Sequence, residues 1–345
     1  MKKDRYYFAS DNSAPVCPEA WDALTRANVD AIGSYGNDAI TRDAKQKIRD
    51  FFQTDCEVFF VFNGTGANAL LVSAMCERFE TVLTHKHAHI ETDECSAPEF
   101  FGAGTKLKSL TGAAAKLDFN LLKKQLEIPR EVHFAPTGAV SVTQPSELGA
   151  IYSAAEMREL GDLCRLHDVW LHVDGARFTN ALVASGSSAA DLTWKAGVDC
   201  LSFGGTKQGL GFSEAVVIFN PELAKNFAYR QKQGAQLASK MRFLSAPWSM
   251  FLNDGIWDRY AKNANQMAKD LAKMLSGFGF EPVFPVQANS AFYRLPQELH
   301  QKLEQRGWHI YPFAEETVRF MTSWNSRPEQ IAELKSDLSE LLSKP

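Results

Sequence analysis

The stretch Val198-Asp199-Cys200-Leu201-Ser202-Phe203-Gly204-Gly205-Thr206-Lys207-Gln208-Gly209-Leu210-Gly211 predicts a buried strand that ends beside a lysine. Residues 200 to 203 have strand character, and a turn of small residues follows them. Lys207 stands in that turn with glycines on both sides. We expect the fold to hold its amine in place there rather than leave it in solvent. We therefore expect the rest of the chain to be organised around this lysine.

Short apolar runs alternate with longer segments of helical period on both sides of this stretch. Such alternation is typical of an α/β protein in which helices cover a mostly parallel sheet. We predict strands over residues 58–62, 81–84, 140–144, 169–173, 200–203 and 215–219, and helices over residues 69–79 and 154–166.

The pattern changes after Trp257. A long helical segment, 259–275, leads into a Gly/Pro-rich passage, and two strand-like runs, 291–295 and 317–322, flank a short helix before a terminal helix over 328–342. We therefore expect a large domain over residues 1–250 and a smaller α+β domain over residues 251–345.

Composition excludes several classes of partner. The chain has 345 residues, with 37 Lys and Arg against 41 Asp and Glu, a net charge of −4 and no basic block. Neither nucleic acid nor an anionic membrane is implied. The six cysteines show no metal or disulfide spacing, and the N-terminus lacks a signal peptide. We expect a cytoplasmic protein that binds a small molecule, without a membrane partner.

A glycine-rich turn, Gly64-Thr65-Gly66, lies between a predicted strand and a predicted helix. Glycines let the backbone approach an anion, and a helix N-terminus offers free N–H groups and a positive dipole end. The turn suits a phosphate but matches neither G-x-G-x-x-G nor a P-loop, which disfavours dinucleotides and nucleoside triphosphates. An ordinary capped turn remains the alternative.

Three histidines, His85, His87 and His89, occupy alternate positions after a predicted strand. Extended geometry would place them on one face. Three ligands on one short strand rarely converge on one ion, so we expect no metal and a single functional histidine. The acidic cluster that follows, residues 91–94, is expected to cap the next helix or to orient that histidine.

An aspartate, Asp174, stands at the carboxyl end of a buried strand, the edge where open α/β sheets bind ligands. A buried charge there is costly unless it meets a cation. That cation is either Arg177, in a structural ion pair, or a ring nitrogen of a cofactor. Together with a phosphate cradle and Lys207, Asp174 makes an inventory for pyridoxal phosphate.

These segments resemble the aspartate-aminotransferase-like (fold type I) pyridoxal phosphate enzymes and, more closely, the low-specificity L-threonine aldolases of the β-eliminating lyase group. The resemblance covers nearly the whole chain and implies a three-layer, mostly parallel sheet with a smaller C-terminal domain. The segments that carry it are Phe8–Asn12, Tyr35–Asp38, Phe62–Asn68, Ala88–Glu94, His172–Arg177, Gly204–Lys207, Met241–Arg242 and Val318–Phe320.

The resemblance implies roles for individual residues. Lys207 would form the Schiff base with pyridoxal phosphate, Asp174 would pair with its ring nitrogen, and His89 would stack on the ring. The remaining cofactor contacts would come from Gly64, Thr65 and Gly66 at the phosphate, Arg177 at O3′, and Arg242 at the phosphate of a neighbouring subunit. The substrate would meet Ser10, Tyr35, Gln144, Arg177 and Arg319, with its carboxylate held by Ser10 and the two arginines.

The implied reaction is aldol cleavage of L-threonine and L-allo-threonine to glycine and acetaldehyde, in a homotetramer built as a dimer of dimers. Another branch of the family carries Asn-Thr-His near the point where this chain has Ser146, so the base for the β-hydroxyl is His89 or a bound water. Transamination or β-elimination of a related amino acid is the nearest alternative. A nucleotide-binding or non-catalytic protein is the alternative from another class.

Overall fold

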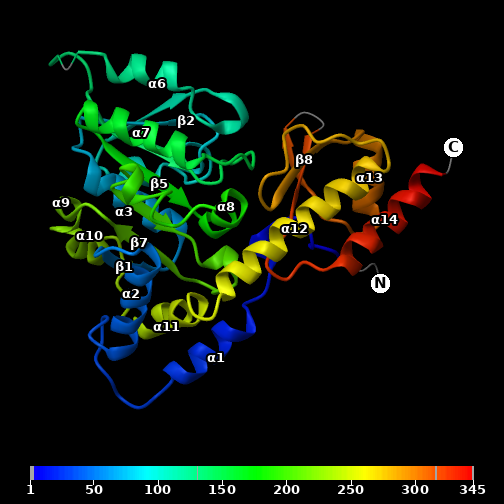
Figure 1. The fold of residues 1–345 in the computed structure, drawn as a ribbon, viewed down its shortest axis with the longest axis horizontal. Helices are drawn as coiled ribbons and strands as arrows, with labels where there is room; N and C mark the ends of the chain where they lie inside the picture. Colours follow the sequence, from blue (N-terminus) through cyan, green and yellow to red (C-terminus); the bar gives the residue numbers. More distant parts are fainter. Residues whose placement is uncertain (1–3, 130, 315–316, 344–345) are drawn as a thin grey trace.

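Seven strands form the central sheet of the computed structural model, which describes residues 4–129, 131–314 and 317–343 (Figure 1). Their order is β1-β7-β6-β5-β4-β2-β3. Strands β2 to β6 run parallel, whereas β7 is antiparallel to both of its neighbours, β1 and β6. The bounds are β1 Glu57–Val61, β2 Thr81–His85, β3 Lys106–Leu110, β4 Thr137–Thr143, β5 Trp170–Gly175, β6 Cys200–Phe203 and β7 Glu214–Ile218.

Both faces of this sheet are buried, which makes three layers. Within β7, Val217 packs into one hydrophobic core, while Val216 and Ile218 pack into another. This division follows from the alternation of side chains along a strand, and it explains why the strands read as continuous apolar runs. The helices of this part are α1 Pro18–Ala27, α2 Ala39–Phe52, α3 Gly64–Met75, α4 His89–Thr92, α5 Ala97–Phe101, α6 Phe119–Leu126, α7 Ala154–Leu166, α8 Phe178–Ser185, α9 Pro221–Ala224, α10 Phe227–Gln233 and α11 Arg242–Phe251.

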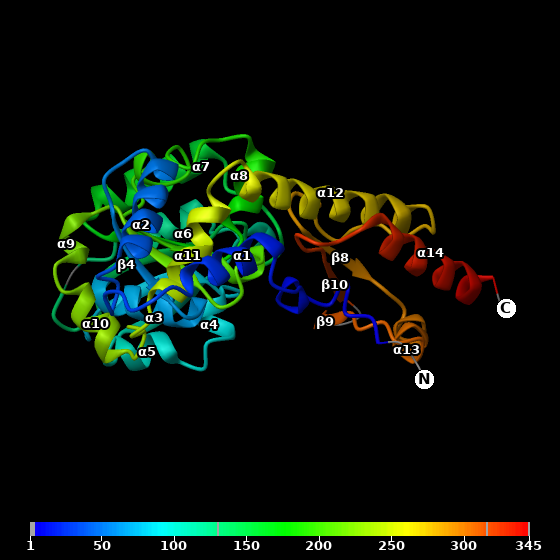
Figure 2. The same ribbon diagram turned by 90° about the horizontal axis from the view of Figure 1, so that it is seen from below.

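A smaller α+β unit follows, as expected from the sequence. Its antiparallel sheet has the order β8-β10-β9, and the long helix α12 leads into it from the large sheet (Figures 1 and 2). Phe8 from the N-terminal segment belongs to its core, so that segment lies against the small sheet. The boundary at residues 250/251 stays a proposal. The bounds are α12 Ile256–Ser276, β8 Ser290–Arg294, α13 Gln297–Gln305, β9 Tyr311–Ala314, β10 Thr317–Met321 and α14 Pro328–Leu342.

Two predictions from the sequence were wrong in detail. The helix expected over 69–79 is α3, which ends at Met75 and begins at Gly64, because Asn63 caps it by accepting a hydrogen bond from the Gly66 N–H at 2.7 Å. The glycine-rich turn is therefore the first turn of a helix. Strands β3 and β9 were not expected, since β3 lies at the sheet edge and carries lysines where a buried strand has apolar residues. In the described part of the chain, no helix is long and apolar enough to cross a membrane.

Gly204 is required by the close approach of two strand ends. A Cβ atom at this position would lie 2.3 Å from the Ala176 carbonyl oxygen, which is backbone and has no room to move. We expect Gly204→Ala to lower the free energy of unfolding by about 1–3 kcal/mol, the usual cost of overpacking. Denaturant unfolding of the cofactor-free protein measures it.

Gly64→Ala is the matched control, because nothing lies within 4 Å of a Cβ atom there. Its free energy of unfolding should stay equal to that of the unchanged protein or rise slightly, since alanine favours a helix. Equal stability of the two variants would contradict the steric argument.

Candidate active site

Polar side chains meet where the parallel strands end. Thr143 of β4 is in register with Asp174 of β5, and Asp174 is in register with Ser202 of β6. The carboxyl ends of parallel strands share one edge, so these residues stand side by side at the rim where such sheets bind ligands. The turn after β6 carries Lys207 to the same rim in a short 3₁₀ segment, Thr206–Gln208.

Lys207 is a partly buried residue whose amine has no bonding partner among the described residues. Its ammonium forms no hydrogen bond or ion pair within the described residues, although Glu214 lies near it. Burial and the positive charge of Arg177 lower the pKa of Lys207, which favours the neutral, nucleophilic amine. Glu214 instead accepts the Gly205 N–H at 2.7 Å and holds the turn, and burial raises the pKa of Glu214 to about 7.

Asp174 is a buried carboxylate that remains charged. Burial acts to raise its pKa, but the charges of His89 and Lys207 and a hydrogen bond from Asn68 outweigh burial and lower it. Its Oδ1 atom also accepts the Ala176 N–H at 3.0 Å. The ion pair between Asp174 and Arg177 considered from the sequence does not form, so that alternative is wrong.

Arg177 pairs with Asp11 instead. Its Nε and Nη2 atoms donate to the two carboxylate oxygens of Asp11 at 2.6 and 2.8 Å. Asn289 donates to the same carboxylate at 3.1 Å. A bidentate pair of this kind fixes the plane of the guanidinium, and it orients the part of Arg177 that Asp11 does not use.

The first turn of α3 offers an open anion site. Gly64 has nothing within 4 Å of a Cβ position, whereas a Cβ at Gly66 would meet the side-chain amide of Gln236 at 2.6 Å. Gln236 in turn accepts the Phe62 N–H at 2.8 Å. Strand β1 runs in the same direction as β6, because both are antiparallel to β7, so the N-terminus of α3 that follows β1 lies at the same sheet edge as Lys207. The positive end of the helix dipole is therefore at this rim.

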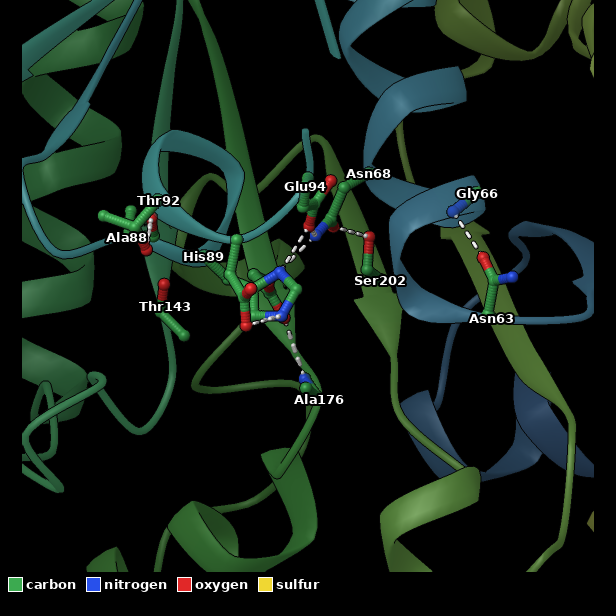
Figure 3. Close-up of polar contacts among 12 residues, drawn as sticks. Asn63, Gly66, Asn68, Ala88, His89, Thr92, Glu94, Thr143, Ala176 and Ser202 are labelled. Carbon is green, nitrogen blue, oxygen red and sulfur yellow. Dashed lines mark hydrogen bonds and ion pairs between the residues drawn. The ribbon is translucent and has the colours of Figure 1, made fainter. Parts of the chain in front are cut away.

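His89 opens the short helix α4. Its Nδ1 atom lies 2.7 Å from Glu94 Oε1, and its backbone N–H donates to Glu147 at 2.9 Å. The hydrogen bond to Glu94 raises the pKa of His89 against the opposing effect of burial. Of the two roles expected for the acidic cluster, Glu94 therefore orients the histidine (Figure 3). Among the described residues, no group of His, Cys, Asp and Glu side chains is arranged to hold a metal ion.

Arg319 carries an uncommitted buried nitrogen. Its guanidinium stacks on Tyr311, 4.6 Å from the ring centre, and its Nε atom is buried without a hydrogen-bond partner. Burial and the nearby charge of Arg177 lower the pKa of Arg319 to about 10. Ser10 accepts the Asn12 N–H at 3.2 Å at the start of a 3₁₀ turn that also contains Asp11. Arg319 thus faces a site that already contains a second arginine.

Three expected site residues have other surroundings. Both amide atoms of Gln144 bond to the backbone of Tyr152, at 2.7 and 3.0 Å. Tyr35 is about half exposed and contacts Lys232. Arg242 begins α11, where its Nε donates to the Ala27 carbonyl oxygen at 3.0 Å.

Ser146, near the point where another branch has a histidine, is bound to the loop itself. Its hydroxyl donates to the Ala114 carbonyl oxygen at 2.7 Å and accepts the Ala150 N–H at 3.1 Å. The next residue, Glu147, bonds to Thr143 at 2.6 Å, and burial raises its pKa to about 7. The titratable group of this loop is thus Glu147.

No role at the site was expected from the sequence for Asp11, Asn68 or Glu147. Asp11 and Asn68 stand within the Phe8–Asn12 and Phe62–Asn68 runs, but nothing in those runs indicated their partners. Asn68 itself carries a usable signal, because it is a polar residue in the middle of a mostly apolar helix. A buried polar side chain there needs a hydrogen-bond partner.

Comparison with known proteins identifies the family of this chain. The model of the beta-eliminating lyase family matches residues 7–297. A low specificity L-threonine aldolase from Pseudomonas sp. (strain NCIMB 10558) is 43% identical over 345 residues, 99% of this chain and 100% of that protein. A protein of the same name from Pseudomonas aeruginosa is 44% identical over 333 residues, 96% of each chain.

Solved structures confirm the fold class. A threonine aldolase from Leishmania major matches with a TM-score of 0.92 and 26% identity, covering 98% of this chain and 100% of that one. A cysteine desulfurase from Thermococcus onnurineus, at 15% identity and a TM-score of 0.73, shares the fold alone. The predicted fold type I architecture is therefore correct. The chain belongs to the beta-eliminating lyase family and, within it, to the low-specificity L-threonine aldolases.

Proposed function

We propose that this protein is a pyridoxal-phosphate-dependent carbon–carbon lyase that cleaves L-threonine, L-allo-threonine and other β-hydroxy-α-amino acids to glycine and an aldehyde. The observation that carries the proposal is the amine of Lys207, which has no bonding partner among the described residues and lies in the turn after β6, the strand beside Asp174. The family to which the chain belongs depends on pyridoxal phosphate.

The residues at the rim fit this cofactor. A lysine with a lowered pKa, an ionised aspartate and an open helix N-terminus match its aldehyde, ring nitrogen and phosphate. An unpaired amine that is withdrawn from water costs free energy, and groups with such perturbed pKa values cluster at functional sites. The residues that would hold the cofactor are Lys207, Asp174, His89, Arg177, Gly64, Thr65 and Gly66, together with Arg242 from a neighbouring subunit.

When bound, pyridoxal phosphate supplies an electron-accepting ring that takes up the charge left when the Cα–Cβ bond of the substrate breaks. Asp174 would pair with the ring nitrogen and would hold a proton there, which would keep the ring electron-poor. Arg319, Arg177 and Ser10 hold the substrate carboxylate, and this fixes the torsion that selects which Cα bond breaks.

His89 takes the proton of the β-hydroxyl, directly or through a water. Its imidazole is the group at the rim whose ordinary pKa lies near neutral pH. Ser146, near the point where another branch has a histidine, is bound to its own loop. Without a second histidine to fix the hydroxyl, both configurations at Cβ should be accepted.

The remaining parts of the proposal concern assembly and placement. Arg242 spends its Nε on Ala27, and its terminal nitrogens form no hydrogen bond within the described residues. They are available to the phosphate of a neighbouring subunit, in a homotetramer of two such dimers. We further propose that Tyr35 and Gln144 contact the substrate and that the protein is cytoplasmic.

Incubation of the purified protein with L-threonine and with L-allo-threonine tests the reaction. We expect each substrate to give acetaldehyde and glycine in equal amounts, because Ser146 is bound to its own loop and leaves the hydroxyl free to take either configuration. Coupled alcohol dehydrogenase measures the aldehyde. Formation of a keto acid or release of ammonia without acetaldehyde would instead establish transamination or β-elimination.

Lys207→Ala removes the proposed covalent anchor. We expect the visible chromophore that borohydride fixes to the protein to disappear, and turnover to fall below detection. Absorbance before and after borohydride measures it. Lys225→Ala, which changes an exposed lysine just after α9, is the control and should keep both. A retained, reducible chromophore in Lys207→Ala would refute the assignment.

Arg319→Leu removes the proposed grip on the substrate carboxylate. Loss of a charged hydrogen bond costs about 1.5–3 kcal/mol, so KM for L-threonine should rise about 10–100-fold. The matched control is Arg294→Leu on the neighbouring strand β8, where the arginine is exposed. Steady-state kinetics decide it, and equal KM values for the two variants would exclude Arg319 from the substrate site.

A further inference from the structure

Asn68 joins the two acidic groups of the site. Its amide nitrogen donates to Glu94 Oε1 at 2.7 Å (Figure 3). The same nitrogen donates to Asp174 Oδ2 at 2.9 Å. A primary amide has two N–H groups, so each carboxylate receives one of them. The side chain is buried in α3, between the rim strands and the segment that contains His89. The residue that meets the cofactor ring and the residue that meets the histidine therefore share one support.

The orientation of this amide is set from its other end. Ser202 donates its hydroxyl proton to Asn68 Oδ1 at 2.6 Å. A flipped amide would turn its oxygen toward two carboxylates, which accept hydrogen bonds and do not donate them. The arrangement with nitrogen toward Asp174 and Glu94 is thus the one that satisfies every group.

The protonation of His172 follows from the same reasoning. The Ser202 proton is spent on Asn68, so the Ser202 oxygen must accept from His172 Nε2, which lies 3.1 Å away. Burial lowers the pKa of His172 to about 4, and the ring is neutral at physiological pH. Its Nδ1 atom therefore carries no proton and accepts from Ser141 at 2.9 Å.

The series of hydrogen bonds that includes Asn68 ends at His89. Glu94 Oε1 receives Asn68 on one side and His89 Nδ1, at 2.7 Å, on the other. A carboxylate only accepts, so Nδ1 carries the proton. In the neutral ring the lone pair then belongs to Nε2, the atom not bound to Glu94.

We propose that Asn68 is a positioning residue that holds Asp174 and Glu94 in fixed orientations and, through Glu94, leaves Nε2 of His89 as the proton acceptor of the site. We name the hydrogen-bonded series Ser141, His172, Ser202 and Asn68 the buried relay. The relay supports both carboxylates with neutral donors. The role of His89 Nε2 as a proton acceptor rests on the proposed function, whereas the inferred proton positions do not depend on it.

The charged groups around His89 determine the direction of a pH effect. Glu94 and Asp93 from its own segment and Asp174 from β5 favour the protonated ring, Glu147 accepts its backbone N–H, and Lys207 and burial oppose protonation. The net effect raises the pKa of His89. Without Asn68, the charge on Glu94 is less shared, so the ring should keep its proton to a higher pH.

Solid-state ¹⁵N spectra of the cofactor-bound protein with labelled histidine rings test the proton positions without any substitution. We expect His172 to carry its proton on Nε2 alone, unchanged between about pH 6 and 9, and neutral His89 to carry its proton on Nδ1. His172→Gln and His89→Asn serve to identify the signals. The opposite tautomer at either ring would overturn the inference.

Asn68→Ala tests the coupling. The rising limb of the pH profile of kcat should move up by about one pH unit, together with the ring-nitrogen titration of His89. Asn263→Ala is the matched control, because that amide also donates to two acceptors, the Trp324 and Ser326 carbonyl oxygens, but lies outside the site. A lowered melting temperature with an unchanged profile and titration would reduce Asn68 to a structural role.

Ser202→Ala is the second variant and decides the question if Asn68→Ala does not fold. It removes the acceptor of His172 Nε2–H, so the His172 signals should change and the His89 titration should shift in the same direction. Unchanged signals at both rings would contradict the relay. Correct tautomers with no aldehyde released from either threonine would refute the proposed function and leave the relay intact.

Discussion

The constraint on which the site depends is the burial of charge at the end of a parallel sheet. Asp174, Lys207 and Arg177 stand together at the rim, where each charge would be costly alone. The fold meets this cost with partners from distant segments: Asp11 for Arg177 and Asn68 for Asp174. The amine of Lys207 is the exception among the described residues, because no side chain bonds to it and burial lowers its pKa, which favours the neutral, nucleophilic form.

The partners come from outside the sheet, which explains the layout of the molecule. Asp11 belongs to an N-terminal segment. Phe8, three residues earlier in the same segment, packs in the core of the small sheet. Asn289, which precedes β8, bonds to the same carboxylate. Arg177 is thus held by residues that the small domain positions, while Asp174 is held by the large domain. A displacement of the small sheet would move the support of Arg177 without altering the support of Asp174.

Residues that act through local pattern were predictable from the sequence, and residues that act through tertiary contact were not. Lys207 and Asp174 follow apolar runs, and a strand end at the rim of an α/β sheet is a position that periodicity reveals. Asp11 looks like any turn residue, and its partner lies in a segment far along the chain. The helix start at Gly64 was misplaced because glycines suggest a turn, and only the Asn63 cap shows that the helix has begun.

One sequence signal would have revealed the buried relay. Three neighbouring strands carry a polar residue on one face amid apolar neighbours: Ser141, His172 and Ser202. In strands buried on both faces, such residues must bond to each other or to a helix above them, because water does not reach them. Asn68 is the polar residue that α3 presents to them, and Asp174 is where the relay reaches the rim. Alternating polarity within buried strands therefore indicates which side chains support a site, even where no motif marks them.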